Sequence, residues 1–396
     1  MSNYSHRKSE KTVTLTDKGG APVKNREVTV RQINHEFLFG CAEFGLIPYV
    51  NGELSGRELE FAEKCAQKAL DLFNFVTLPF YWGRFEPEKG KPDTARLMKA
   101  AKWLQAKDRK VKGHPLCWHT VCAPWLLDMT NEDILKTQLA RIRRDVSDFA
   151  GVIDTWDAIN EVVIMPIFDK YDNGVTRICK DLGRIELVKR VFAEAKAANP
   201  NATLLINDFD MSESYDILIE GLLAAGVPID VIGLQSHMHQ GAWSDEKALE
   251  ILERYSRFKL PLHFTEVNMV SGDLMPKHIV DLNDFEVDEW STTPEGEERQ
   301  ARDAANLYKI LFNHPSVEAI TWWSFTDGGW LNAPAGFITS GGRVKPVYYE
   351  INSLINRYWK TPDYLAATDE NGALKLSGFK GCYSVEFGGE AKEFTL

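Results

Sequence analysis

The chain has 396 residues, of which 44% are hydrophobic, and carries a formal net charge of −11. This length fits a single α/β barrel with additional segments, and the apolar fraction is enough for a large core. The negative charge argues against a nucleic-acid partner, because surfaces that bind nucleic acid are usually basic.

The sequence shows no signal for a membrane or for disulfide bonds. No apolar run is long enough to cross a membrane, and the N-terminal residues lack the apolar stretch of a signal peptide. The six cysteines show no CxxC pair and no regular spacing. We therefore expect a cytoplasmic protein with free thiols. A secreted protein whose signal peptide has been removed is the alternative.

The two ends of the chain share a pattern of alternating apolar and polar residues. Residues 11–33 alternate with a period of two around a Gly-rich turn, and residues 372–396 do likewise. This pattern predicts antiparallel strands. Because a lone hairpin is only marginally stable in water, we expect the segments 1–34 and 361–396 to pair into a small β-module. We interpret its role as structural, with carbohydrate binding as the alternative.

Between these ends, residues 35–360 alternate short apolar runs with amphipathic stretches. The runs are rich in β-branched and aromatic residues and predict strands at 37–44, 73–80, 109–118, 155–161, 203–209, 231–237, 260–267 and 319–327. The stretches between them repeat apolar residues with the helical period and predict helices at 58–73, 94–107, 134–149, 185–198, 218–226, 248–258, 298–312 and 347–359.

Eight strand–helix units predict an α/β fold, a (β/α)8 TIM barrel that forms the catalytic domain over 35–360. A doubly wound open sheet is the alternative architecture. No Gly-rich phosphate-binding motif follows a predicted strand, which argues against a nucleotide-binding version of either fold.

Most predicted strands end in polar or aromatic side chains that an apolar core would not select. In a barrel these strand ends meet at the C-terminal face, where active sites lie. Each residue taken singly is explained as a satisfied polar group, but the set as a whole indicates a functional site. Its members are His114, Trp118, Asn160, Glu161, Asn207, Asp208, Gln235, His237, Glu266, Asn268, Thr326 and Asp327.

Glu161 and Glu266 are the two strand-end glutamates, on the fourth and seventh predicted strands. Two carboxyl groups across a barrel mouth suit the hydrolysis of a glycosidic bond, in which one is protonated and the other ionised. Asn160 is placed to hydrogen-bond a sugar hydroxyl, and His237 to orient Glu266 and keep it ionised.

Four tryptophans fall at or just after predicted strand ends. Their indole faces can stack on the apolar C–H faces of sugar rings. Trp330 is the strongest candidate, because it lies in the Gly-rich loop "TDGGWLNAPAG", which has little core to fill. The others are Trp118, Trp125 and Trp323.

The segments "KGHPLCWHTVCAPW", "TWDAINE", "LLINDFD", "GLQSHMH", "HFTEVN" and "WWSFTD" resemble, in order and spacing, those of glycoside hydrolase family 10, the endo-β-1,4-xylanase family. The resemblance covers roughly residues 35–360. It implies a (β/α)8 barrel, hydrolysis with retention of configuration, no metal and no cofactor. It also implies Glu161 as acid/base, Glu266 as nucleophile, and a sugar site lined by His114, Trp118, Asn160, Gln235, His237, Trp323 and Trp330.

Two departures from the family pattern bear on the substrate. On the second strand the family has a Glu-Asn pair and then a Lys that hold remote sugars, but here Pro79, Phe80 and Gly83 stand at those places. After the nucleophile, Asn268 replaces an Asp, which alters the relay through His237. We therefore expect weak action on long xylan and a preference for short or decorated xylo-oligosaccharides, with xylose as the reacting sugar and glucose second.

Three alternative functions remain open from the sequence. The first is a β-glycosidase that acts on a glycoside with a bulky aglycone. The second is a metal-dependent barrel hydrolase, suggested by the H-x-H pair at 237–239. The third is a non-catalytic sugar-binding barrel, which would typically have lost one of the two carboxylates. The sequence does not indicate an oligomeric state.

Overall fold

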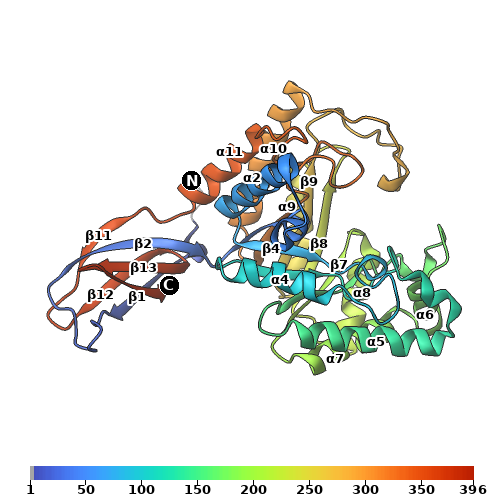
Figure 1. Cartoon of the computed structure of the whole chain (residues 1–396), viewed down its shortest axis with the longest axis horizontal. Coiled ribbons are helices and arrows are strands. Elements are labelled where there is room, and N and C mark those ends of the chain that lie inside the picture. The colour runs from blue at the N-terminus through green and yellow to red at the C-terminus, as the bar shows by residue number, and fades with distance from the viewer. Residues whose placement is uncertain (1–3) are drawn as a thin grey trace.

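A closed barrel of eight parallel strands forms the centre of the computed structural model, which describes residues 4–396 (Figure 1). The predicted TIM barrel is confirmed, and the alternative of an open sheet is wrong. The barrel closes in the order β10-β3-β4-β5-β6-β7-β8-β9. Its strands are β3 (Leu38–Ala42), β4 (Phe75–Pro79), β5 (Lys110–His114), β6 (Thr155–Asn160), β7 (Thr203–Asp208), β8 (Val231–Met238), β9 (Leu262–Met269) and β10 (Val317–Trp323).

Several strands are shorter than the apolar runs that predicted them. The run 109–118 supplies only β5, which ends at His114. Pro115 has no N–H to continue the ladder, and the N–H of Leu116 instead donates to the carbonyl of Asp157 at 2.9 Å. Trp118 therefore lies in the loop beyond β5, at the mouth of the barrel.

Amphipathic helices surround the barrel, and α5 (Asn131–Asp148) illustrates why they form. Thr130 caps its N-terminus by accepting a hydrogen bond from the N–H of Asp133, and Ile134, Ile142 and Val146 bury one face. No helix within residues 4–396 is both long and apolar enough to span a membrane. The other predicted helices correspond to α2 (Gly56–Leu72), α4 (Thr94–Gln105), α7 (Arg184–Ala198), α8 (Glu213–Ala224), α9 (Asp245–Ser256), α10 (Pro294–Asn313) and α11 (Pro346–Ser353).

Three short helices were not predicted: α1 (Leu46–Asn51), α3 (Trp82–Phe85) and α6 (Gly174–Leu182). The α6 segment begins with Gly174 and contains β-branched residues, which have low helix propensity. It is helical because Asn173 caps it, accepting from the N–H of Thr176 at 2.8 Å, and because Val175 and Ile178 are buried.

The two ends of the chain pair beside the barrel, as predicted (Figure 1). One sheet joins β1 (Lys8–Thr14) to β12 (Ala373–Phe379), and the other has the order β11-β2-β13-β14. A core that includes Val30, Leu376 and Val385 lies between them. The remaining strands are β2 (Glu27–His35), β11 (Tyr364–Ala367), β13 (Gly381–Phe387) and β14 (Glu390–Thr395).

Candidate active site

Two glutamates lie at the C-terminal mouth of the barrel, where the sequence predicted them. Glu161 directly follows β6, and Glu266 lies within β9. Both have left-handed backbones, with φ of 55° and 57° respectively. This conformation costs a residue with a side chain roughly 1–2 kcal/mol. Such strain clusters at functional sites, where surrounding contacts hold the residue in place.

Three donors surround the carboxyl group of Glu161. Its Oε2 accepts from the indole N–H of Trp118 at 2.8 Å, and its Oε1 accepts from the amides of Asn160 at 3.2 Å and Gln235 at 3.1 Å. Burial raises the pKa of Glu161 to about 8, and the nearby charge of Glu266 adds to the shift. Glu161 therefore holds a proton at neutral pH.

The carboxylate of Glu266 has a different environment. Its Oε1 accepts from the amide of Asn207 at 2.9 Å, and its Oε2 lies 3.0 Å from Nε2 of His237. Burial alone would raise the pKa of Glu266, but the hydrogen bond from His237 and the charge of His114 outweigh it and lower the pKa. Neighbouring carboxyl groups whose pKa values are shifted in opposite directions can serve as an acid and an ionised nucleophile.

Buried amide side chains connect the two carboxyl groups. Gln235 Nε2 donates to Glu161 and to Oδ1 of Asn160, each at 3.1 Å. Asn207 Nδ2 donates to the same Asn160 oxygen at 2.8 Å and to Glu266 at 2.9 Å. The two carboxyl groups are therefore joined by a continuous chain of amide hydrogen bonds through Asn160 and Asn207.

Asn207 was counted among the strand-end residues, but sequence reasoning gave it no individual role. Asn207 lies in register with Asn160 across β7 and β6, and its Oδ1 accepts from the hydroxyl of Thr265 at 2.6 Å, which orients the amide. Gly233 leaves room for it, since a Cβ there would lie 2.4 Å from Asn207 Oδ1. The available signal was its position one residue before the end of its strand.

A buried ion pair inside the barrel fixes His114. Asp157 Oδ2 lies 2.7 Å from Lys112 Nζ and 2.7 Å from His114 Nδ1. Burial alone would raise the pKa of Asp157, but the charge of Lys112 and the hydrogen bond from His114 outweigh it and lower the pKa. Neither Lys112 nor Asp157 was predicted as a site residue. Asp157 stands between apolar residues in β6, which was the available signal. Lys112 shares the short β5 with Lys110 and His114 and gave no such signal.

Aromatic side chains form a wall beside the glutamates. The ring of Trp323 packs edge to face against His114, with centroids 5.2 Å apart. Tyr81 follows β4 and contacts both His114 and Trp118, at centroid distances of 5.7 Å and 5.5 Å. Trp330 lies against His237 at 4.4 Å. The structure thus brings together the two glutamates and the residues expected to line the sugar site, namely His114, Trp118, Asn160, Gln235, His237, Trp323 and Trp330.

Only Tyr81 of the aromatic run 80–82 belongs to this wall. Phe80 is buried against Phe149 and Trp156, at centroid distances of 5.1 Å and 4.8 Å. Trp82 is also buried and packs edge to face on Trp125 at 5.6 Å. Phe80 and Trp82 therefore do not line the groove, because both point into the packing between the barrel and its helices.

Two other predicted strand-end residues hold loops. Asp208 is buried and accepts from the N–H of Val163, two residues after Glu161, at 3.0 Å. Burial raises the pKa of Asp208 to about 7. Asp327 forms an ion pair with Lys345 at 2.7 Å. Asp327 thus holds the loop after β10, whereas Asp208 lies near enough for its charge to contribute to the raised pKa of Glu161.

The H-x-H pair is divided between two environments. His237 engages Glu266, whereas His239 is buried between Trp330 and Trp290, at centroid distances of 5.1 Å and 5.9 Å. Among residues 4–396, no group of three or more His, Cys, Asp and Glu side chains is arranged to hold a metal ion.

Comparison with known proteins gives a consistent result. The sequence profile of glycosyl hydrolase family 10 matches residues 52–353. Endo-1,4-beta-xylanase B of Thermotoga neapolitana is 26% identical over 325 residues, which are 76% of this chain and 85% of that protein. Anti-sigma-I factor RsgI6 of Acetivibrio thermocellus is 24% identical over 389 residues, which cover 96% of this chain but only 45% of that protein.

The solved structures agree with the sequences. Native xylanase 10B from Thermotoga maritima superposes with a TM-score of 0.66 at 25% identity, over 82% of this chain and 96% of that one. The matched segment 52–353 includes seven of the eight barrel strands and both glutamates. The chain belongs to glycosyl hydrolase family 10.

Proposed function

We propose that this family 10 hydrolase cleaves β-1,4-xylosidic bonds with retention of configuration, with Glu161 as the general acid and base and Glu266 as the nucleophile. The observation that carries the proposal is a pair of carboxyl groups, joined through Asn160 and Asn207, whose surroundings shift their pKa values in opposite directions. Retaining hydrolysis requires this division, because one group must give a proton while the other attacks.

In the first step Glu266 attacks the anomeric carbon while Glu161 gives its proton to the departing glycosidic oxygen. The bond to the leaving sugar breaks as a covalent bond to Glu266 forms. In the second step Glu161, now ionised, takes a proton from water, which attacks the same carbon and releases Glu266. Asn207 and His237 each hold one oxygen of Glu266, so the carboxylate is oriented before substrate arrives.

Xylose is the sugar that we propose for the reacting position. The names of the T. neapolitana and T. maritima relatives support this assignment, since both are xylanases. Trp323 and Trp330 offer indole faces next to His114 and His237, where a sugar ring would have to sit to reach both glutamates. The partner that we propose is therefore a xylo-oligosaccharide or a xylan-type chain.

Two features support a preference for short or decorated chains over long xylan. At the end of β4, where the family resemblance led us to expect hydrogen-bonding side chains, the aromatic ring of Tyr81 faces the site. In addition, Lys170 Nζ lies 2.6 Å from Asp281 and 2.5 Å from Asp284, which joins the loops that follow β6 and β9. Since β7 and β8 lie between those strands, this ion pair links loops from separate parts of the barrel rim, and we propose that it narrows the space for a long chain.

The test is a panel of aryl β-glycosides, xylotriose and polymeric xylan, with Glu266→Ala from the same preparation as the matched control. We expect the wild type to release product from aryl β-xyloside and xylotriose with higher kcat/KM than from xylan, and the control to release none. The first-formed sugar should be the β-anomer by NMR.

Three results would contradict the proposal. Faster cleavage of β-glucosides would overturn the xylose assignment. Random mid-chain cleavage of xylan, with long products appearing early, would overturn the size preference. A complete lack of turnover by the wild type would favour the non-catalytic sugar-binding alternative.

A further inference from the structure

The loop after β10, residues 324–345, places Trp330 over the catalytic centre. The indole of Trp330 packs on His237 with ring centroids 4.4 Å apart, and His237 lies 3.0 Å from Glu266. Only one side chain therefore separates this loop from the proposed nucleophile. Whatever fixes the loop also fixes the surface against which His237 rests.

The conformation of this loop is strained. Leu331 and Asn332, which directly follow Trp330, have left-handed backbones with φ of 55° and 54°. Gly336 passes so close to the start of the loop that a Cβ there would lie 2.4 Å from the backbone nitrogen of Asp327. Strained segments persist only where the surrounding structure holds them in place.

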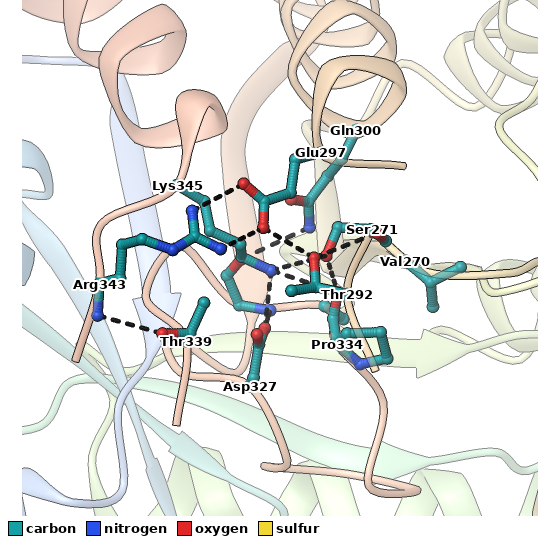
Figure 2. Close-up of polar contacts among 12 residues, drawn as sticks. Val270, Ser271, Thr292, Glu297, Gln300, Asp327, Pro334, Thr339, Arg343 and Lys345 are labelled. Atoms are coloured by element: carbon teal, nitrogen blue, oxygen red, sulfur yellow. Dashed lines mark hydrogen bonds and ion pairs between the residues drawn. The ribbon is translucent and has the colours of Figure 1, made fainter. Parts of the chain in front are cut away.

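Lys345 supplies such a hold (Figure 2). Its side chain is 0% exposed, and its Nζ donates to Asp327 Oδ1 at 2.7 Å, to Ser271 Oγ at 2.9 Å and to the carbonyl of Pro334 at 3.2 Å. Asp327 precedes Trp330 and Pro334 follows it, while Ser271 comes two residues after β9, the strand that carries Glu266.

A second charged contact in the same cluster serves as a comparison (Figure 2). Arg343 donates two hydrogen bonds to Glu297, at 2.8 Å and 2.6 Å. Thr292 donates to Glu297 at 2.9 Å and lies 2.7 Å from Ser271 Oγ. The side chain of Arg343 is 57% exposed. Its guanidinium hydrogen-bonds Glu297 of α10 and not Asp327 or Pro334, the residues on either side of Trp330 that Lys345 contacts.

We propose that Lys345 is a positioning residue for glycoside hydrolysis. The N–H and the hydroxyl of Ser271 bond the carbonyl of Pro334 directly, at 2.9 Å and 2.7 Å. The ammonium of Lys345 ties Asp327 to this pair, and it thereby holds Trp330 against His237 and orients Glu266. The effect on catalysis rests on the proposed function, whereas the effect on the loop does not. A purely stabilising role for Lys345 would change the melting temperature of the protein and leave the kinetics of the folded enzyme unaltered.

The first test is Lys345→Met, which keeps the length of the side chain and removes the ammonium. We expect kcat/KM for xylotriose to fall by about tenfold, within the range of coupling between residues in contact. The acid limb of the pH profile should move to higher pH, because His237 is held less well against Glu266. In a Trp330→Ala background, Lys345→Met should cause no further loss, since both changes act through the same side chain.

Arg343→Gln is the matched control. It removes a charged contact from the same cluster and should lower the melting temperature while kcat/KM and the pH profile stay as in the wild type. Hydrogen exchange of residues 327–336 gives a readout that does not need activity. Exchange should become faster in Lys345→Met and stay unchanged in Arg343→Gln.

Wild-type kinetics in folded Lys345→Met, or losses that add to those of Trp330→Ala, would overturn the proposal. If Lys345→Met does not fold, Ser271→Ala removes one contact of Lys345 together with the bonds of the hydroxyl to Pro334 and Thr292. It should change exchange and kinetics in the same direction, and no change there would also overturn the proposal. A wild type without glycosidase activity would contradict the proposed function, and the exchange comparison would still decide whether Lys345 holds the loop.

Discussion

His237 and Glu266 are joined by a contact of 3.0 Å between Nε2 and Oε2, while the other ring nitrogen of His237, Nδ1, has no partner among residues 4–396. Asn268 lies in register with His237, and its Oδ1 is also without a partner in the described chain. The amide of Asn268 therefore makes no hydrogen bond to His237, and the ionisation of Glu266 depends on its direct contacts with His237 and Asn207 and on the nearby charge of His114.

Replacement of His237 by alanine should raise the pKa of Glu266. Burial would then act with less opposition, and the loss of a hydrogen bond to a charged group, worth about 1.5–3 kcal/mol, corresponds to roughly one to two pKa units. Because the nucleophile must be ionised, the acid limb of kcat/KM against pH should move upward by that amount. Asn268→Ala is the control and should leave the acid limb in place. An unmoved acid limb in His237→Ala would contradict this assignment.

The alkaline limb should report Glu161. The pKa of Glu161 is raised to about 8, and its proton is needed in the first step, so kcat/KM should fall as pH rises through about 8. Glu161→Gln should lose activity by roughly 10²–10⁴-fold on substrates with poor leaving groups. On an aryl glycoside with a good leaving group the same variant should lose its alkaline limb, and retention of that limb would assign it to another residue.

The stability of the folded protein should also depend on pH through the raised pKa of Glu161. Glu161 stays protonated in the folded protein up to about pH 8, whereas the ordinary value for a glutamate is 4.5. The unfolded chain therefore releases this proton first, and the contribution of Glu161 to stability is lost as pH rises from 4.5 through 8. Glu161→Gln should thus raise the melting temperature more at pH 8 than at pH 4.5. A shift that is equal at the two pH values would show that this carboxyl group is not so perturbed.

The ion pairs of Lys170 with Asp281 and Asp284 should slow the hydrolysis of long substrates. Lys170→Met should increase the ratio of kcat/KM on xylan to kcat/KM on xylotriose, by a few-fold at most because partly exposed ion pairs are worth about 1 kcal/mol or less. Lys136→Met is the control, since Lys136 pairs with Glu132 at 2.7 Å within α5. Equal ratios in the two variants would show that the ion pairs of Lys170 do not restrict the cleft.

The barrel and its glutamates were predictable because periodicity identifies strands, and the ends of parallel strands meet at one face. Glu161 and Glu266 thus came together from positions 105 residues apart without any knowledge of loop structure. The predicted strand boundaries were less accurate. The run that ends at Trp118 lost its last four residues to a loop, because Pro115 interrupts the ladder.

Contacts between loops were not predictable in the same way. Lys345 reaches Asp327 across 18 positions and Ser271 across 74, and no local pattern announces such a contact. The inward direction of Tyr81 and the outward direction of Phe80 depend on where β4 ends, which hydrophobicity alone does not give. Asn207 was visible as a strand-end amide, but its link between two carboxyl groups requires the register of β6 and β7.

The most direct test of the central claim is azide rescue of Glu161→Ala on an aryl β-xyloside with a good leaving group. If Glu266 forms the covalent intermediate and Glu161 serves as acid and base, azide should accelerate turnover by occupying the space of the missing carboxyl group. The product should then be the β-glycosyl azide by NMR. Formation of the α-glycosyl azide from this variant would mean that the roles of the two glutamates are reversed, and would contradict the mechanism.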